Sequence, residues 1–95
     1  MLFAIMATDH PNSLAQRLAN RPAHLERLAI LQAAGKLILA GPFPAPDEQG
    51  FTGSLIVADF ENLIAAQEWA SCDPYQLAGV YANIHIKPFK QVFPK

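Results

Sequence analysis

The stretch KLILAGPFPAPDEQGFTGSLIVAD, residues 36–59, decides the fold of this chain. It contains two short apolar runs, residues 36–40 and 54–59, and such runs are typical of β-strands. Residues 41–50 between them are rich in proline and glycine, which predicts a loop and not a helix. Two strands are therefore expected to follow each other directly in the middle of the chain.

A strand and a helical segment are expected before this stretch. Residues 2–8 are apolar and predict the first strand. Asn12 or Ser13 can cap a helical pattern that then runs to Ala34, and Gly35 is expected to end it. We predict a break near residues 20–22, because a proline disfavours the helical conformation of the residue before it.

A second helix and a last strand are expected after the stretch. Residues 61–71 predict the helix, and Pro74 marks its end. Residues 80–87 alternate in polarity, as a strand with one buried face does. The apolar face is expected to hold Val80, Ala82, Ile84 and Ile86, and the polar face Tyr81, Asn83, His85 and Lys87.

The order strand, helix, strand, strand, helix, strand predicts an α+β, ferredoxin-like βαββαβ fold in one domain, residues 1–95. Its sheet would be four-stranded and antiparallel, with two helices on one face. The first three predicted strands are apolar on both sides, so both faces of the sheet need to be covered. We therefore expect the open face to pack against a second copy in a homodimer.

Composition excludes several other classes of protein. Hydrophobic residues make up 52% of the chain and charged residues 16%, with a formal net charge of −1. No basic patch favours nucleic acid, and no stretch has the length of a membrane span, so we expect a cytoplasmic protein that binds neither. Cys72 is the only cysteine, which leaves no internal disulfide and no cysteine-rich metal site.

His24 is the first candidate for chemistry. It lies on the leucine side of the first helix, where it is either a core histidine with satisfied nitrogens or a proton carrier. Asp73 follows the second helix and is either the cap of the next turn or a partner of His24. Because both helices should start at the same edge of the sheet, Asp73 is expected toward the far edge. Asp9, at the end of the first strand, is therefore a rival partner for His24.

Five short segments resemble one family, the YciI-like (YCII-related) proteins. They are RPAHLERL (21–28), AGP (40–42), GFTGS (50–54), DPYQLAGVY (73–81) and KPFK (87–90). The resemblance implies a ferredoxin-like dimer, related in shape to dimeric α+β barrels. It also implies an active site centred on a histidine and an aspartate, which here match His24 and Asp73. The best-defined activity in the family is dehydrochlorination of a chlorinated hydroxyquinol, a substrate that we do not transfer to this chain.

Six further residues are expected to contact a ligand near this centre. A glycine permits close approach of the backbone, a serine donates a hydrogen bond, and aromatic side chains form a wall. The alternative for most of them is an ordinary role in turns or in the core. The six are Gly41, Pro42, Phe51, Gly53, Ser54 and Tyr81.

Two classes of function are compatible with these residues. The first is an enzyme of the lyase or isomerase type that carries out acid and base chemistry on a small cyclic metabolite. A histidine held by a carboxylate can take and give a proton, so this chemistry needs no cofactor and no metal. The second is a dimer that binds or senses a small molecule without turnover. Loss of turnover on substitution of His24 separates the two.

Overall fold

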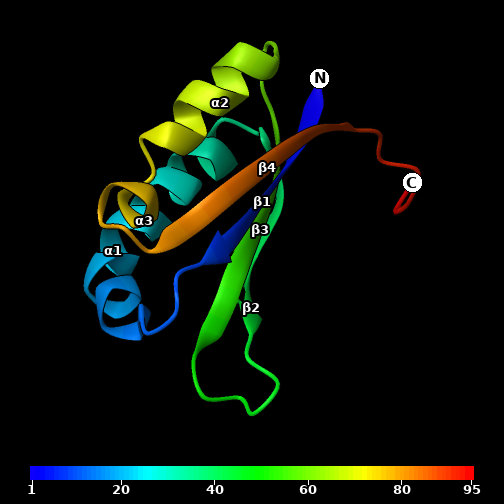
Figure 1. The fold of residues 1–95 in the computed structure, drawn as a ribbon. Coiled ribbons are helices and arrows are strands. Elements are labelled where there is room, and N and C mark those ends of the chain that lie inside the picture. Colours follow the sequence, from blue (N-terminus) through cyan, green and yellow to red (C-terminus); the bar gives the residue numbers. More distant parts are fainter.

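The predicted ferredoxin-like fold is confirmed in a computed structural model that describes residues 1–95. The sheet order is β2-β3-β1-β4, and all neighbouring strands are antiparallel. Figure 1 shows this arrangement. The elements are β1 (Leu2–Asp9), α1 (Leu14–Ala33), β2 (Leu37–Pro44), β3 (Phe51–Asp59), α2 (Leu63–Ser71), α3 (Pro74–Leu77) and β4 (Tyr81–Phe89).

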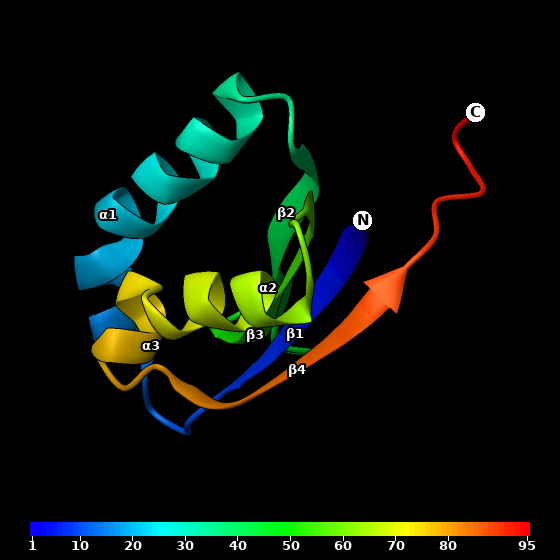
Figure 2. The same ribbon diagram turned by 90° about the horizontal axis from the view of Figure 1, so that it is seen from above.

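All three helices lie on the same side of the sheet, as the view from above shows (Figure 2). The core fills the space between them. Phe3, Ile5 and Ile56 project from the central strands, and Leu28 and Leu31 meet them from α1. Burying side chains of this size contributes about 1.5–3 kcal/mol each, so the core holds α1 firmly against the sheet.

The predicted break in the first helix is wrong, because α1 is continuous and contains Pro22. Pro22 and its neighbours are exposed, so the carbonyl group that proline leaves without a partner can bond to water. Continuity has a structural consequence. Arg17 and His24 are seven residues apart and therefore lie two turns apart on the buried face of α1.

Two strands are longer in the structure than the sequence predicts, because residues 41–44 extend β2 and residues 51–53 extend β3. Strand β2 continues to Pro44, and β3 already begins at Phe51. The prolines in β2 suggested a loop, but β2 is an edge strand, where a missing N–H is tolerated. Pro42 pairs with Ser54 across the two strands, so the paired ends of β2 and β3 extend beyond the helices (Figure 1).

The last strand departs from the expected alternation at its start. The pairing of β1 with β4 shifts between Thr8 and Asp9, so that Thr8 faces Asn83 and Asp9 faces Tyr81. One extra residue in β4 reverses the alternation there. Tyr81 is therefore buried, whereas the sequence pattern placed it on the polar face.

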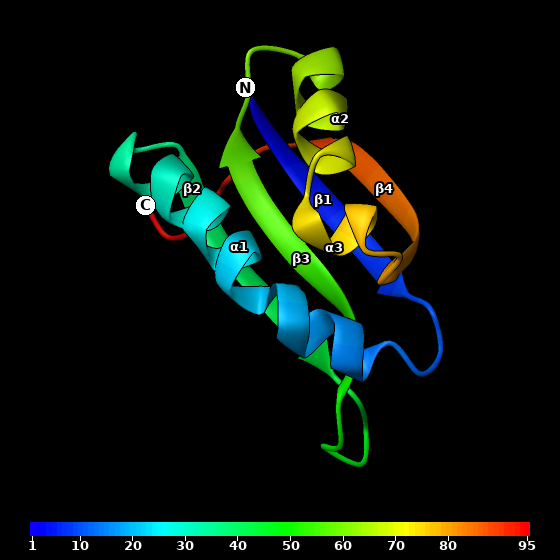
Figure 3. The ribbon, with the colours of Figure 1, turned by 90° about the vertical axis from the view of Figure 1, so that its left-hand side faces the viewer.

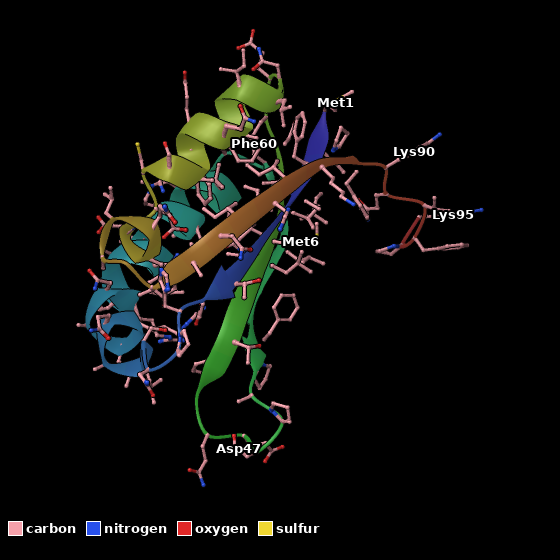
Figure 4. All side chains as sticks on the ribbon, viewed as in Figure 1. Met1, Met6, Asp47, Phe60, Lys90 and Lys95 are labelled. Carbon is pink, nitrogen blue, oxygen red and sulfur yellow. The ribbon has the colours of Figure 1, made fainter.

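The other face of the sheet carries no helix. Met6 projects from it, away from the helices, in the side-chain view (Figure 4). Leu39 and Phe43, on β2, are 48% and 42% exposed. None of the helices is both long enough and apolar enough to cross a membrane.

Candidate active site

His24 and Asp73 are in direct contact. The Nδ1 atom of His24 lies 2.9 Å and 3.1 Å from the two carboxylate oxygens of Asp73. Both residues are buried: 7% of the surface of His24 and 2% of the surface of Asp73 are exposed to solvent. The expected separation across the sheet is removed by α3, which packs beside α1 and begins directly after Asp73 (Figure 3).

The carboxylate of Asp73 is held in place from a second side. It caps α3 by accepting a hydrogen bond of 2.9 Å from the backbone N–H of Tyr75. Pro74 therefore starts a helix, in addition to following the end of α2. The cap and the contact with His24 are both present, so the two interpretations of Asp73 are compatible.

The imidazole of His24 is fixed by stacking as well as by hydrogen bonding. The ring of Tyr75 lies parallel to it, with ring centres 4.0 Å apart and an angle of 17° between the planes. An ionised carboxylate only accepts hydrogen bonds, so a neutral His24 must carry its proton on Nδ1. Its Nε2 atom is then an unprotonated acceptor.

A cavity of about 470 Å³ opens beside this pair. Its walls come from α1, from the ends of β2 and β3, and from Tyr75. His24 lines it, and Nε2 makes no hydrogen bond within the chain and is not enclosed. The volume lies in the range of cavities that hold small organic ligands. No three His, Cys, Asp or Glu side chains are grouped as a metal site requires.

Four of the six predicted ligand contacts line this cavity: Gly41, Pro42, Phe51 and Ser54. Gly53 does not line it. A Cβ atom at Gly53 would collide with the carbonyl oxygen of Ala7, so glycine is required there by the close approach of β1. Tyr81 does not line the cavity either, and its buried hydroxyl has no hydrogen-bond partner.

Asp9 binds Arg17 and not His24. Its two carboxylate oxygens lie 2.9 Å from Nε and 3.0 Å from Nη2 of Arg17. The pair is almost entirely buried, with 5% of the arginine side chain and 3% of the aspartate side chain exposed. The alternative in which Asp9 partners His24 is therefore wrong, and Asp9 contacts Arg17, which lines the cavity in its place.

Arg17 was not among the residues singled out from the sequence, although it lines the cavity. Its spacing of seven residues from His24 was the available signal. Burial disfavours its charge, but the hydrogen bond and the charge of Asp9 outweigh that effect and raise the pKa of Arg17. Arg17 is a permanent cation of this site.

Both tyrosines near the site stay protonated at neutral pH. Burial raises the pKa of Tyr75, and burial together with the charge of Asp73 raises the pKa of Tyr81 further. Each phenol can therefore donate a hydrogen bond but carries no negative charge.

Replacing Tyr81 with phenylalanine is expected to keep or raise stability. The hydroxyl of Tyr81 is buried with no hydrogen bond of good geometry, although Ser54 lies close enough to offset part of the rise that burial causes in its pKa. A buried hydroxyl without such a bond costs about 1–3 kcal/mol. The pKa of the Tyr81 phenol is also higher in the folded state than in the unfolded state, so the folded state keeps this proton to higher pH. The free energy of unfolding of the unmodified protein should therefore fall as pH rises above about 10.

Urea unfolding at several pH values measures both effects. Tyr81→Phe should show a shallower fall above about pH 10, with the remaining slope due to Tyr75. A loss of more than about 1 kcal/mol at pH 7 would indicate that the hydroxyl has a partner after all.

Comparisons with known proteins agree with the fold and the motifs. The YCII-related domain family matches residues 1–90. The chain is 53% identical over 98 aligned positions to protein YciI of Escherichia coli O6:H1, covering 98% of this chain and all of that one. It is 55% identical, with the same coverage, to an uncharacterized protein of Haemophilus influenzae Rd.

Solved structures are also similar to this chain. Among them is the 5-chloro-2-hydroxyhydroquinone dehydrochlorinase of Burkholderia phenoliruptrix AC1100, in complex with 2,5-dihydroxybenzoquinone. The two chains share 32% identity and superpose with a TM-score of 0.84. The match covers 95% of this chain and 94% of the dehydrochlorinase.

Proposed function

The chain belongs to the YCII-related domain family, and we propose that it is a small-molecule enzyme in which His24 carries a proton. Asp73 positions the imidazole, and the substrate is a small cyclic compound that occupies the adjacent cavity. The reaction is an isomerisation or an elimination that needs only the transfer of protons.

One observation carries this proposal. The Nδ1 atom of His24 is held by a buried carboxylate at 2.9 Å, and its other nitrogen is left open beside a cavity. A histidine that only filled the core would have both nitrogens satisfied. Here the bonded nitrogen fixes the ring and the free nitrogen is available to a ligand, which is the arrangement of a general base.

The chemistry follows from the proton positions. Nε2 accepts a proton from a hydroxyl or an acidic carbon of the substrate, and Asp73 stabilises the imidazolium that forms. In an isomerisation His24 returns the proton to another atom of the same molecule. In an elimination the substrate loses the proton to His24 and a leaving group departs as an anion.

The similar structure supports the class of reaction. A dehydrochlorinase removes hydrogen and chloride from its substrate, and its chain shares this fold at 32% identity. We do not transfer its substrate to this chain. The support is that the same scaffold performs an elimination on a small hydroxylated ring.

The test is a turnover assay on a panel of small hydroxylated and halogenated rings. Each compound is incubated in D₂O and followed by NMR for exchange of carbon-bound hydrogen, and halogenated compounds are also followed for release of halide. The proposal expects turnover of at least one compound, which a His24→Gln variant does not catalyse. Binding without turnover across the panel would favour the alternative, a binding or sensing protein.

We also propose that the open face of the sheet binds a second copy of this chain. Leu39 and Phe43 pair with residues of β3 that alternate with the core residue Ile56, so they lie on the open face. They expose apolar surface there, in a chain with only 16% charged residues. An exposed apolar sheet face of this kind favours association. A closed twofold pair would cover both copies at once.

The dimer has a direct test. Light scattering of the unmodified protein at micromolar concentration should give twice the chain mass of 10.4 kDa. A Leu39→Glu/Phe43→Glu variant should give the mass of one chain, since two charges on each copy would be buried against each other. A Leu77→Glu variant changes a more exposed leucine, 74% exposed, on the helix side and should remain dimeric.

A further inference from the structure

We propose that Arg17 is the anion-binding residue of the cavity, and that it takes a negatively charged oxygen of the ligand through its free nitrogen Nη1. Asp9 is the positioning residue that holds Arg17 in place. The inference rests on the proposed function in that both concern the same cavity, and it assigns to the ligand a negative charge.

The hydrogen bonds of Arg17 leave one nitrogen free. Nε bonds to Asp9, and Nη2 lies within 3.0 Å of Asp9, of the carbonyl oxygen of Gly53 and of the hydroxyl of Ser54. Those three acceptors use all the protons of Nη2. Nη1 takes part in none of these hydrogen bonds, and the Tyr75 phenol lies close enough to Arg17 for the arginine to offset part of the rise that burial causes in its pKa. Nη1 is not enclosed by protein, since the buried atoms without a partner are Arg27 Nη1 and Tyr81 Oη. It therefore faces the cavity that Arg17 lines.

The guanidinium is also fixed by aromatic rings. Its carbon lies 4.6 Å from the ring centre of Tyr75 and 5.4 Å from that of Phe51. Tyr75 is the same ring that stacks on His24. The guanidinium of Arg17 and the imidazole of His24 therefore both pack against the ring of Tyr75. Because both residues line the cavity, a ring-shaped ligand there can contact both.

The charges around the cavity favour an anion. Arg17 and Arg21 line it, and no aspartate or glutamate does. The two buried carboxylates, Asp9 and Asp73, lie behind Arg17 and His24. A buried arginine with a free N–H can form charge-assisted hydrogen bonds to an anion. These bonds are stronger than the hydrogen bonds that a neutral side chain in the cavity wall would form.

Binding of 2,5-dihydroxybenzoquinone, whose hydroxyls are ionised at neutral pH, tests the inference. Its neutral counterpart is 2,5-dimethoxybenzoquinone. All proteins carry Cys72→Ser, so that the exposed thiol cannot add to either ring. Calorimetry or NMR gives the dissociation constant of each compound without requiring turnover.

Arg17→Gln is expected to weaken binding of the anion by about 10- to 100-fold and to change binding of the neutral compound little. Because this variant leaves Asp9 buried and unpaired, the neutral double variant Asp9→Asn/Arg17→Gln is measured beside it. Asp9→Asn alone should weaken binding of the anion less than Arg17→Gln does, since the charge remains but its position is no longer fixed.

Arg21→Gln is the matched control, because Arg21 is an exposed cation at the rim of the same cavity. The inference expects only a small effect there. Equal losses in Arg17→Gln and Arg21→Gln, or no binding of the anion by the unmodified site, would overturn it. If the anion binds through Arg17 but the turnover assay finds no reaction, the anion site stands and the enzymatic proposal fails.

Discussion

His24→Gln is expected to lower turnover by about 100- to 10,000-fold, the usual contribution of general acid and base catalysis, while the protein stays folded. Glutamine can still donate a hydrogen bond to Asp73 from a similar position, so the buried carboxylate keeps a partner. What glutamine lacks is a nitrogen that can accept and return a proton. The same NMR assay that identifies a substrate measures the loss.

His10→Gln is the matched control for this prediction. His10 is an exposed residue in the turn after β1, and its side chain makes no hydrogen bond. Turnover of His10→Gln should equal that of the unmodified protein. A His24→Gln variant with unchanged turnover would show that the proton carrier is another group.

Asp73→Ala is expected to cost about 3 kcal/mol of stability, because it removes two buried hydrogen bonds and a helix cap together. The side chain is 2% exposed and holds both Nδ1 of His24 and the backbone N–H of Tyr75. Alanine leaves both groups buried without a partner and removes the cap of α3. Urea unfolding at one fixed protein concentration measures the change, since association alters apparent stability.

Asp73→Asn separates the loss of the cap from the loss of the charge. The asparagine oxygen in the place of Oδ1 can still accept from the backbone N–H of Tyr75 and from Nδ1 of His24. A loss of about 1 kcal/mol is expected. Equal losses for alanine and asparagine, or a loss below about 1 kcal/mol for alanine, would mean that the two hydrogen bonds contribute little.

The order of the elements could be predicted from the sequence because it depends on local patterns. The apolar runs around residues 36–59 and the turn residues between them are local signals, and they specified the split βαββαβ order. The ends of β2 and the continuity of α1 could not be predicted in this way. In both places a proline was tolerated because its missing N–H lies at an exposed or edge position, which only the assembled fold reveals.

The candidate site was accessible from the sequence only in part. His24 and Asp73 stood out as a histidine on an apolar face and a carboxylate at a helix end. Their contact depends on α3, a helix of four residues that is too short to give a periodic pattern. The role of Asp9 depended on Arg17, whose burial is visible only once α1 packs on the sheet.

The most direct test of the account is the tautomer of His24, read from the ¹⁵N chemical shifts of its two ring nitrogens at a pH where the ring is neutral. The account predicts a protonated Nδ1, bound to Asp73, and a bare Nε2 open to the cavity. In Asp73→Ala the preference for a protonated Nδ1 should be lost, because no acceptor then holds that proton. A protonated Nε2 in the unmodified protein, or an Nδ1 preference that Asp73→Ala leaves unchanged, would contradict a proton carrier positioned by Asp73.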